Sequence, residues 1–165
     1  MCVEQKRENK LLSMDNWIKR KEFDTIFSPI IQNGTEIWAI HRVKVLPVEI
    51  INMAIRLSTL DFIKYVKLTD DSIAASSEIA GTRVKNPITT PDHLSATGIT
   101  ILFEPKYKYI NFYEINSTIR GCGSKMVEAV FTDFPMDWQA TVVMDWSEGF
   151  WDKMKKKHST IDWMM

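Results

Sequence analysis

The chain has 165 residues, of which 45% are hydrophobic and 25% are charged, as in one ordinary globular domain with a real core. Its 21 basic and 21 acidic residues balance, which excludes a strong overall attraction to nucleic acid or to an anionic membrane. No stretch approaches the ~20 apolar residues that a membrane helix needs, and the first residues lack the apolar core of a signal peptide. Cys2 and Cys122 are not expected to form a stabilising disulfide, which suits a reducing compartment. We therefore expect one soluble cytoplasmic domain over residues 1–165, without nucleic-acid or membrane partners.

The first half of the chain is expected to begin with an arm and a strand. Residues 1–22 place apolar side chains roughly on one helical face, which indicates a short amphipathic helix or a docked arm. Residues 28–36 are turn-like and contain Asn33-Gly34, the strongest turn dipeptide in the chain. Apolar and β-branched residues then alternate over 36–46, which predicts a strand.

A helical region and a long polar segment are expected next. Apolar residues recur at helical spacing over 47–67, which predicts one helix or two in tandem, with Pro47 in the first turn. Residues 68–93 are polar and contain several glycine and proline breaks, so we expect one short helix within 71–81 and a loop around it. Loops of this length inside a compact domain are often functional.

The second half of the chain has clearer patterns. Residues 94–104 and 107–115 are β-rich runs joined by a turn, which predicts an antiparallel hairpin. A helix over 124–131, a strand over 138–146 and a helix over 147–158 are expected to follow, with Ser147 as the N-cap of that last helix. The tail after residue 158 could add a short strand. This order predicts a mixed α+β (α/β) domain with one strand–loop–helix–strand unit.

A glycine pair marks the loop between the strand that ends near Ile115 and the helix that starts at Ser124. Gly121 and Gly123 would leave backbone N–H groups accessible at a helix start, which carries partial positive charge and binds phosphate well. The dinucleotide fingerprint fails because Met126 stands at its third glycine, and the P-loop fails because its lysine would have to follow a glycine directly. A plain tight turn remains the alternative.

The segment resembles motif A of the GNAT superfamily of acyl-CoA-dependent N-acetyltransferases, which reads Gln/Arg-x-x-Gly-x-Gly/Ala after a strand and opens a helix. Gly121 and Gly123 match its two small positions, while Thr118 departs from Gln/Arg. Farther on, the residues from Phe150 to Lys153 resemble the family's Phe-Tyr-x-Lys-type helix, with Trp151 at the tyrosine position. The indole N–H of tryptophan is a donor but not a usable acid. The resemblance covers residues 95–158.

The resemblance implies a GNAT-like fold, with a central, mostly antiparallel sheet flanked by helices. It implies acetyl-CoA as cosubstrate, no metal, and direct transfer of the acetyl group to a primary amine of a small molecule or a protein. The alternative is a catalytically impaired protein of the same fold that binds acyl-CoA as a regulatory module. A homodimer is left open.

The resemblance also implies which residues form the site. Glu114 is the first candidate for the general base and Glu104 the second, and Tyr113 is the candidate acid, although a solvated carboxylate and a core tyrosine are the structural alternatives. Simple alternation would set Tyr113 and Ile115 on one face of the strand and Phe112 and Glu114 on the other. The residues implied to contact the cofactor are Tyr113, Ile115, Thr118, Ile119, Arg120, Gly121, Cys122, Gly123, Ser124, Phe150, Trp151 and Lys153.

Overall fold

The fold is taken from a computed structural model, which describes residues 30–32, 35–39, 47–81, 86–143, 145 and 147–164. Several sequence predictions lie outside the described residues. These are the arm over 1–22, the turn dipeptide Asn33-Gly34, residues 40–46 of the first expected strand, and Cys2.

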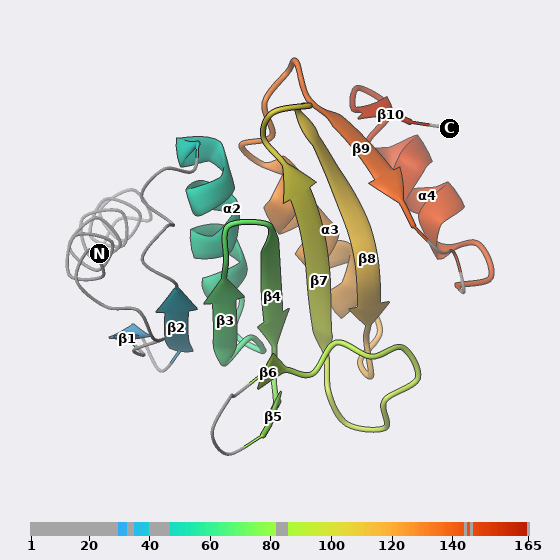
Figure 1. The fold of residues 1–165 in the computed structure, drawn as a ribbon. Coiled ribbons are helices and arrows are strands. Elements are labelled where there is room, and N and C mark those ends of the chain that lie inside the picture. The colour runs from blue at the N-terminus through green and yellow to red at the C-terminus, as the bar shows by residue number, and fades with distance from the viewer. Residues whose placement is uncertain are drawn as a thin grey trace, which may run out of the picture.

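One sheet of eight strands forms the framework of the domain (Figure 1). Its strand order is β1-β2-β3-β4-β7-β8-β9-β10, with four antiparallel and three parallel pairings among the described strands. The strands are β1 (Ile30–Gln32), β2 (Thr35–Ala39), β3 (Tyr65–Leu68), β4 (Ser72–Ser76), β7 (Gly98–Glu104), β8 (Tyr109–Asn116), β9 (Gln139–Val142) and β10 (Asp162–Trp163). The short strands β5 (Ile79–Ala80) and β6 (Asn86–Pro87) form a separate pair.

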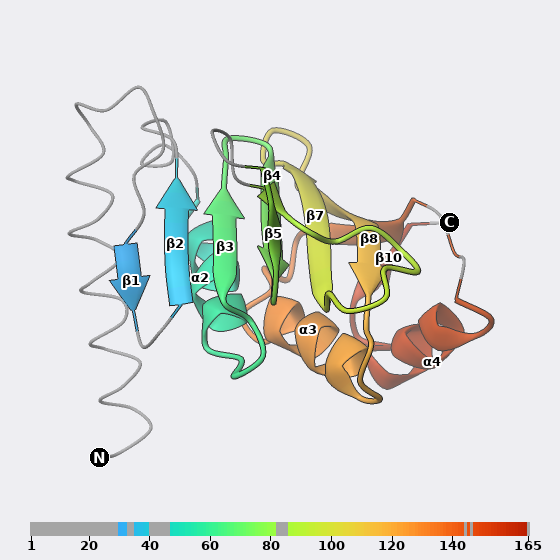
Figure 2. The same ribbon diagram turned by 90° about the horizontal axis from the view of Figure 1, so that it is seen from below.

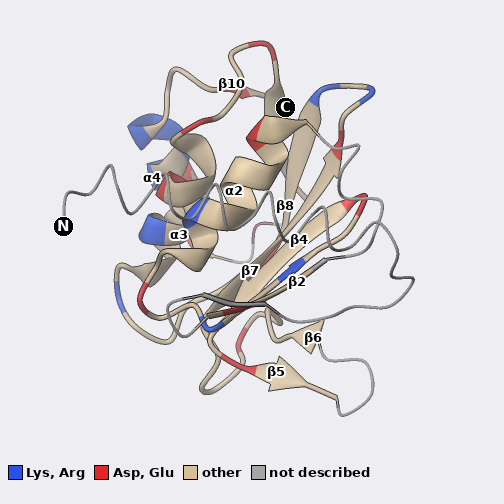
Figure 3. Cartoon of the chain, turned by 90° about the vertical axis from the view of Figure 1, so that its left-hand side faces the viewer, with Lys and Arg blue, Asp and Glu red and all other residues tan. Residues whose placement is uncertain are grey.

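The helices α2 (Val48–Ser58), α3 (Cys122–Phe131) and α4 (Phe150–Lys157) lie on one side of the sheet, as Figure 2 shows. The core lies between them and the sheet, where alternate strand residues meet the apolar faces of the helices. In Figure 3, β5 and β6 lie on the opposite side of the sheet from these helices. Of the described helices, none combines the length and the apolar character needed to cross a membrane.

Two predictions for the first half of the chain are wrong. The expected helix over 47–67 ends at Ser58, and residues Tyr65–Leu68 form β3, in which half-buried and buried residues alternate. The short helix expected within 71–81 is instead β4, which lies between β3 and β7 in the middle of the sheet. The sequence of this segment is compatible with a helix or a strand. It forms a strand because it pairs with β3 on one edge and with β7 on the other.

The elements predicted for the second half are confirmed. The antiparallel hairpin is β7–β8, and it is followed by α3, β9, α4 and the short strand β10. The predicted cap of α4 is wrong, because the helix begins after Gly149, which has a φ of 104°, and no side chain caps it. The Ser147 hydroxyl donates to Asp145 instead. The prediction of a mixed α+β domain is confirmed.

Candidate functional site

β8 and β9 run side by side for only half of the length of β8. Their pairing begins at Tyr109 with Gln139 and ends at Phe112 with Val142, just before Val143 N–H donates to the Phe112 carbonyl at 3.1 Å. β8 continues to Asn116 against β7, but no described strand faces residues 113–116 on the other side. Within the described part of the chain, this edge of β8 therefore has no strand neighbour, and an open strand edge is a template for an extended ligand.

A β-bulge lies where the two strands part. The register between β7 and β8 shifts so that Glu114 pairs with Thr100, Phe112 pairs with Ile101, and Tyr113 is the extra residue. Directly paired residues share a face of the sheet, so Phe112 lies on the core side and Glu114 on the opposite side. The predicted alternation, which set Phe112 and Glu114 on one face, is therefore wrong.

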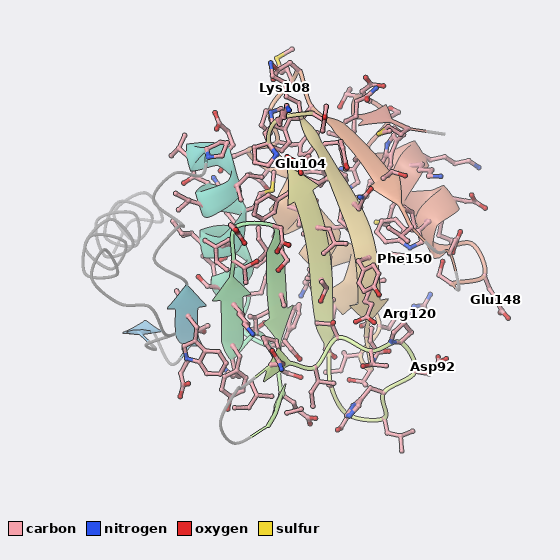
Figure 4. All side chains as sticks on the ribbon, in the orientation of Figure 1. Asp92, Glu104, Lys108, Arg120, Glu148 and Phe150 are labelled. Carbon is pink, nitrogen blue, oxygen red and sulfur yellow. The ribbon has the colours of Figure 1, made fainter. Side chains whose placement is uncertain are left out.

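A cavity of about 250 Å³ lies at this split. Figure 4 shows Asp92, Arg120 and Phe150 around the end of β8 that borders it. Six of its lining residues were expected from the sequence, namely Tyr113, Glu114, Ile115, Gly123, Phe150 and Trp151. Five were not expected to line a site, namely Pro91, Asp92, Asn116, Ser117 and Ser147.

The carboxylate of Glu114 is held in place at the cavity wall. The hydroxyl of Thr89 donates to Glu114 Oε2 at 2.7 Å, and the hydroxyls of Thr89 and Thr100 are 2.6 Å apart. Because the proton of Thr89 is directed to the carboxylate, Thr100 is the donor in the second bond. Thr89 is only 4% exposed, so this chain of hydrogen bonds orients Glu114 from beneath.

The two other catalytic candidates differ in their positions. Tyr113 is 47% exposed and lines the cavity beside Glu114. Glu104 pairs with Tyr109 at the hairpin end of β7, four residues and therefore about 13 Å along the strand from the partner of Glu114. Figure 4 shows Glu104 near Lys108, at the end of the sheet away from Phe150. Of the two candidate bases, the structure thus places Glu104 outside the cavity, whereas Glu114 lines it.

Gly121 and Gly123 are each required to be glycine for a different structural reason. Gly121 is the residue before α3 and has a φ of 91°, a left-handed conformation that favours glycine. A Cβ at Gly123 would stand 3.3 Å from the ring of Phe150, so Gly123 permits the close approach of α3 and α4. The N–H groups of Gly123 and Ser124 donate no hydrogen bond to any described residue. The start of α3 therefore offers donors directly beside the cavity.

The other expected cofactor contacts do not line the cavity. Thr118 faces Thr97, with their hydroxyl oxygens 2.9 Å apart. Cys122 is buried under the helix start. The side chains of Ile119, Arg120 and Lys153 are exposed to solvent. The hydroxyl of Ser124 accepts a hydrogen bond from Lys157 at 3.4 Å.

The unexpected lining residues Pro91 and Asp92 come from the loop between β6 and β7. This loop is fixed to the end of β8, because the Asn116 amide donates to the carbonyls of His93 and Ala96 at 3.0 and 2.7 Å. His93 Nδ1 in turn accepts the Ala96 N–H at 2.9 Å. The only sequence signal for this arrangement was the length of the polar segment.

Comparisons with known proteins add no identification. No family model matches the chain, and neither a curated protein nor a solved structure matches it. Among the residues that the structure describes, no group of three or more His, Cys, Asp or Glu side chains is arranged to hold a metal ion.

Proposed function

We propose that the protein is an acetyl-CoA-dependent N-acetyltransferase with a GNAT-like fold. The observation that carries this proposal is the split between β8 and β9, whose unpaired edge leads to the start of α3. A donor with an amide-bearing arm and a pyrophosphate matches both features at once. A plain tight turn between strand and helix would need neither the open edge nor the cavity.

The donor would lie along β8. The amide groups of the pantetheine arm would pair with the backbone of residues 113–116, as an added strand does. The pyrophosphate would then meet the free N–H groups of Gly123 and Ser124, where the partial positive charge of the helix start favours an anion. The exposed cationic side chain of Arg120, directly before the start of α3, would add attraction.

The acceptor would be a primary amine of a small molecule or a protein. Glu114 would remove a proton from its ammonium group, and the neutral nitrogen would then attack the carbonyl carbon of the thioester. The new C–N bond forms as the C–S bond breaks, and the departing thiolate takes a proton, for which Tyr113 is the candidate donor. No covalent enzyme intermediate is needed, because positioning and polarisation of the thioester supply most of the catalysis.

A second candidate function is the binding of acyl-CoA without catalysis. One observation favours it. The aromatic side chains that α4 contributes to the cavity are those of Phe150 and Trp151, neither of which can protonate a thiolate, and Tyr113 comes from a different element. The two candidates share the donor site and differ only in turnover.

Acetyl-CoA titration and thiol release on a panel of amines test the proposal together. A ligand that binds only the folded state must raise the unfolding temperature, so we expect stabilisation by acetyl-CoA. Glu114→Gln keeps an acceptor for Thr89 and should bind acetyl-CoA as before, while turnover falls by about 10²–10⁴-fold. Glu104→Gln is the matched comparison and should retain turnover. Absence of stabilisation by saturating acetyl-CoA contradicts both candidates, and stabilisation without thiol release selects the binding protein.

A further inference from the structure

Trp151 lines the cavity next to the point where β8 and β9 part. Phe112 is the last residue of β8 that pairs with β9, so it marks the point where the two strands part. The ring centroids of Trp151 and Phe112 are 4.7 Å apart, and Trp151 also lines the cavity. The indole therefore stands at the vertex between the strands.

The position of this indole is firmly held. Trp151 is 2% exposed, and its ring packs against Phe150 at 5.1 Å and Trp163 at 6.5 Å between centroids. Phe150 is in turn confined by the close approach of α4 to Gly123. Close-packed side chains of this kind yield little space to a ligand.

The direction of the donor follows from the two ends of the cavity. Ser117 and Gly123 line it beside the start of α3, whereas Trp151 lines it beside Phe112 at the vertex. If the pyrophosphate lies at the start of α3, as in the proposed function, the arm must run along residues 113–116 toward the vertex. The thioester and its acyl group then point at the indole ring.

We infer that Trp151 is the residue that sets the length of the acyl group, and that the donor is restricted to short-chain acyl thioesters. This inference rests on the proposed function and adds the class of acyl donor and the residue that selects it. The reaction is unchanged, since the acyl carbonyl carbon is attacked and its C–S bond breaks whatever the length of the chain. Longer chains fail because their additional methylene groups meet a packed aromatic ring.

The test is a series of acyl-CoA donors, from acetyl through butanoyl and hexanoyl to octanoyl, with the wild type and with Trp151→Leu. The measurement is the dissociation constant for each donor, together with kcat/KM by thiol release where turnover is present. The wild type should prefer acetyl-CoA. Trp151→Leu should raise the ratio of octanoyl to acetyl by at least about 10-fold, the discrimination that a methylene group gives in an apolar pocket.

The matched control is Trp163→Leu. Trp163 packs on Phe112 at 6.2 Å and on Trp151, but it does not line the cavity. Its loss should also loosen the packing around Phe112 and leave the order of chain lengths as in the wild type. If Trp151→Leu does not fold, Trp151→Phe removes less volume and should shift the preference in the same direction by one or more methylene groups.

The possible outcomes distinguish a failure of the chain-length inference from a failure of the proposed function. Acetyl-CoA binding with an unchanged chain-length ratio in both Trp151 variants overturns the inference and leaves the proposed function standing. An equal shift in the Trp163 control also overturns it, because a general loosening of the core would then be the cause. No binding of any acyl-CoA to the wild type overturns the proposed function and the inference with it.

Discussion

Replacement of Gly121 by alanine should lower the free energy of unfolding by about 1 kcal/mol. The residue has a φ of 91° and a ψ of −18°, and a left-handed conformation costs an L-residue roughly 1–2 kcal/mol. No atom lies within 4 Å of the position that a Cβ would take, so steric conflict adds nothing. Alanine also lowers the conformational entropy of the unfolded chain, which stabilises the folded state by roughly 0.4–1 kcal/mol. The difference between the two effects is the net loss of about 1 kcal/mol.

Urea denaturation of a short series at this position measures the effect. Asn tolerates the left-handed region, so Gly121→Asn should lose less stability than Gly121→Ala, whereas the β-branched Gly121→Val should lose more. The m value should stay constant across the series, because only local backbone energy changes. An alanine variant as stable as the wild type would refute a left-handed conformation at the start of α3.

Three further predictions concern the core, the pH response and the candidate base. Gly98→Ala should cost about 1–3 kcal/mol in urea denaturation, because its Cβ would lie 2.6 and 2.8 Å from two carbonyl oxygens of the backbone; a neutral effect would contradict the packing of the β6–β7 loop. Burial, together with a neighbouring lysine, lowers the pKa of His158, so below pH ~6.5 the unfolded chain takes up a proton that the folded state resists. Stability should fall as pH falls from ~6.5 toward the folded pKa, and His158→Gln should show a shallower fall in thermal melts between pH 7 and 5. Thr89→Val should lower turnover without changing acetyl-CoA affinity, and Thr89→Ser should restore it; equal losses in both variants would contradict an orienting hydroxyl.

The second half of the fold could be predicted because each of its elements has a strong local pattern. The hairpin of β7 and β8 alternates around a turn, and α3 has an apolar face bounded by glycine and proline. β4 lacks such a pattern, because its sequence Ser-Ile-Ala-Ala-Ser suits a helix or a strand equally and is decided by its neighbours. The error at β4 is therefore a tertiary effect on a weak local preference.

The site was predictable in its elements but not in its geometry. The glycine loop was identified from its glycine pair and Trp151 from the resemblance to the GNAT helix motif, and both border the cavity. The face of the sheet on which Glu114 lies was not predicted correctly. The bulge at Tyr113 arises from the pairing of β7 with β8, and the sequence of β8 alone does not indicate it. Asp92 also escaped notice, since its loop reaches the cavity only through hydrogen bonds to the end of β8.

Amide hydrogen exchange of β8, with and without acetyl-CoA, most directly tests whether the unpaired edge receives the donor. Residues 113–116 should exchange more slowly when acetyl-CoA is bound, since the pantetheine arm would hydrogen-bond to them, and the amides at the start of α3 should be protected as well. Residues of β3, which lie away from the cavity, should exchange as before. Binding of acetyl-CoA that leaves exchange in β8 unchanged, or that protects a different part of the sheet, would contradict a donor site at the split between β8 and β9.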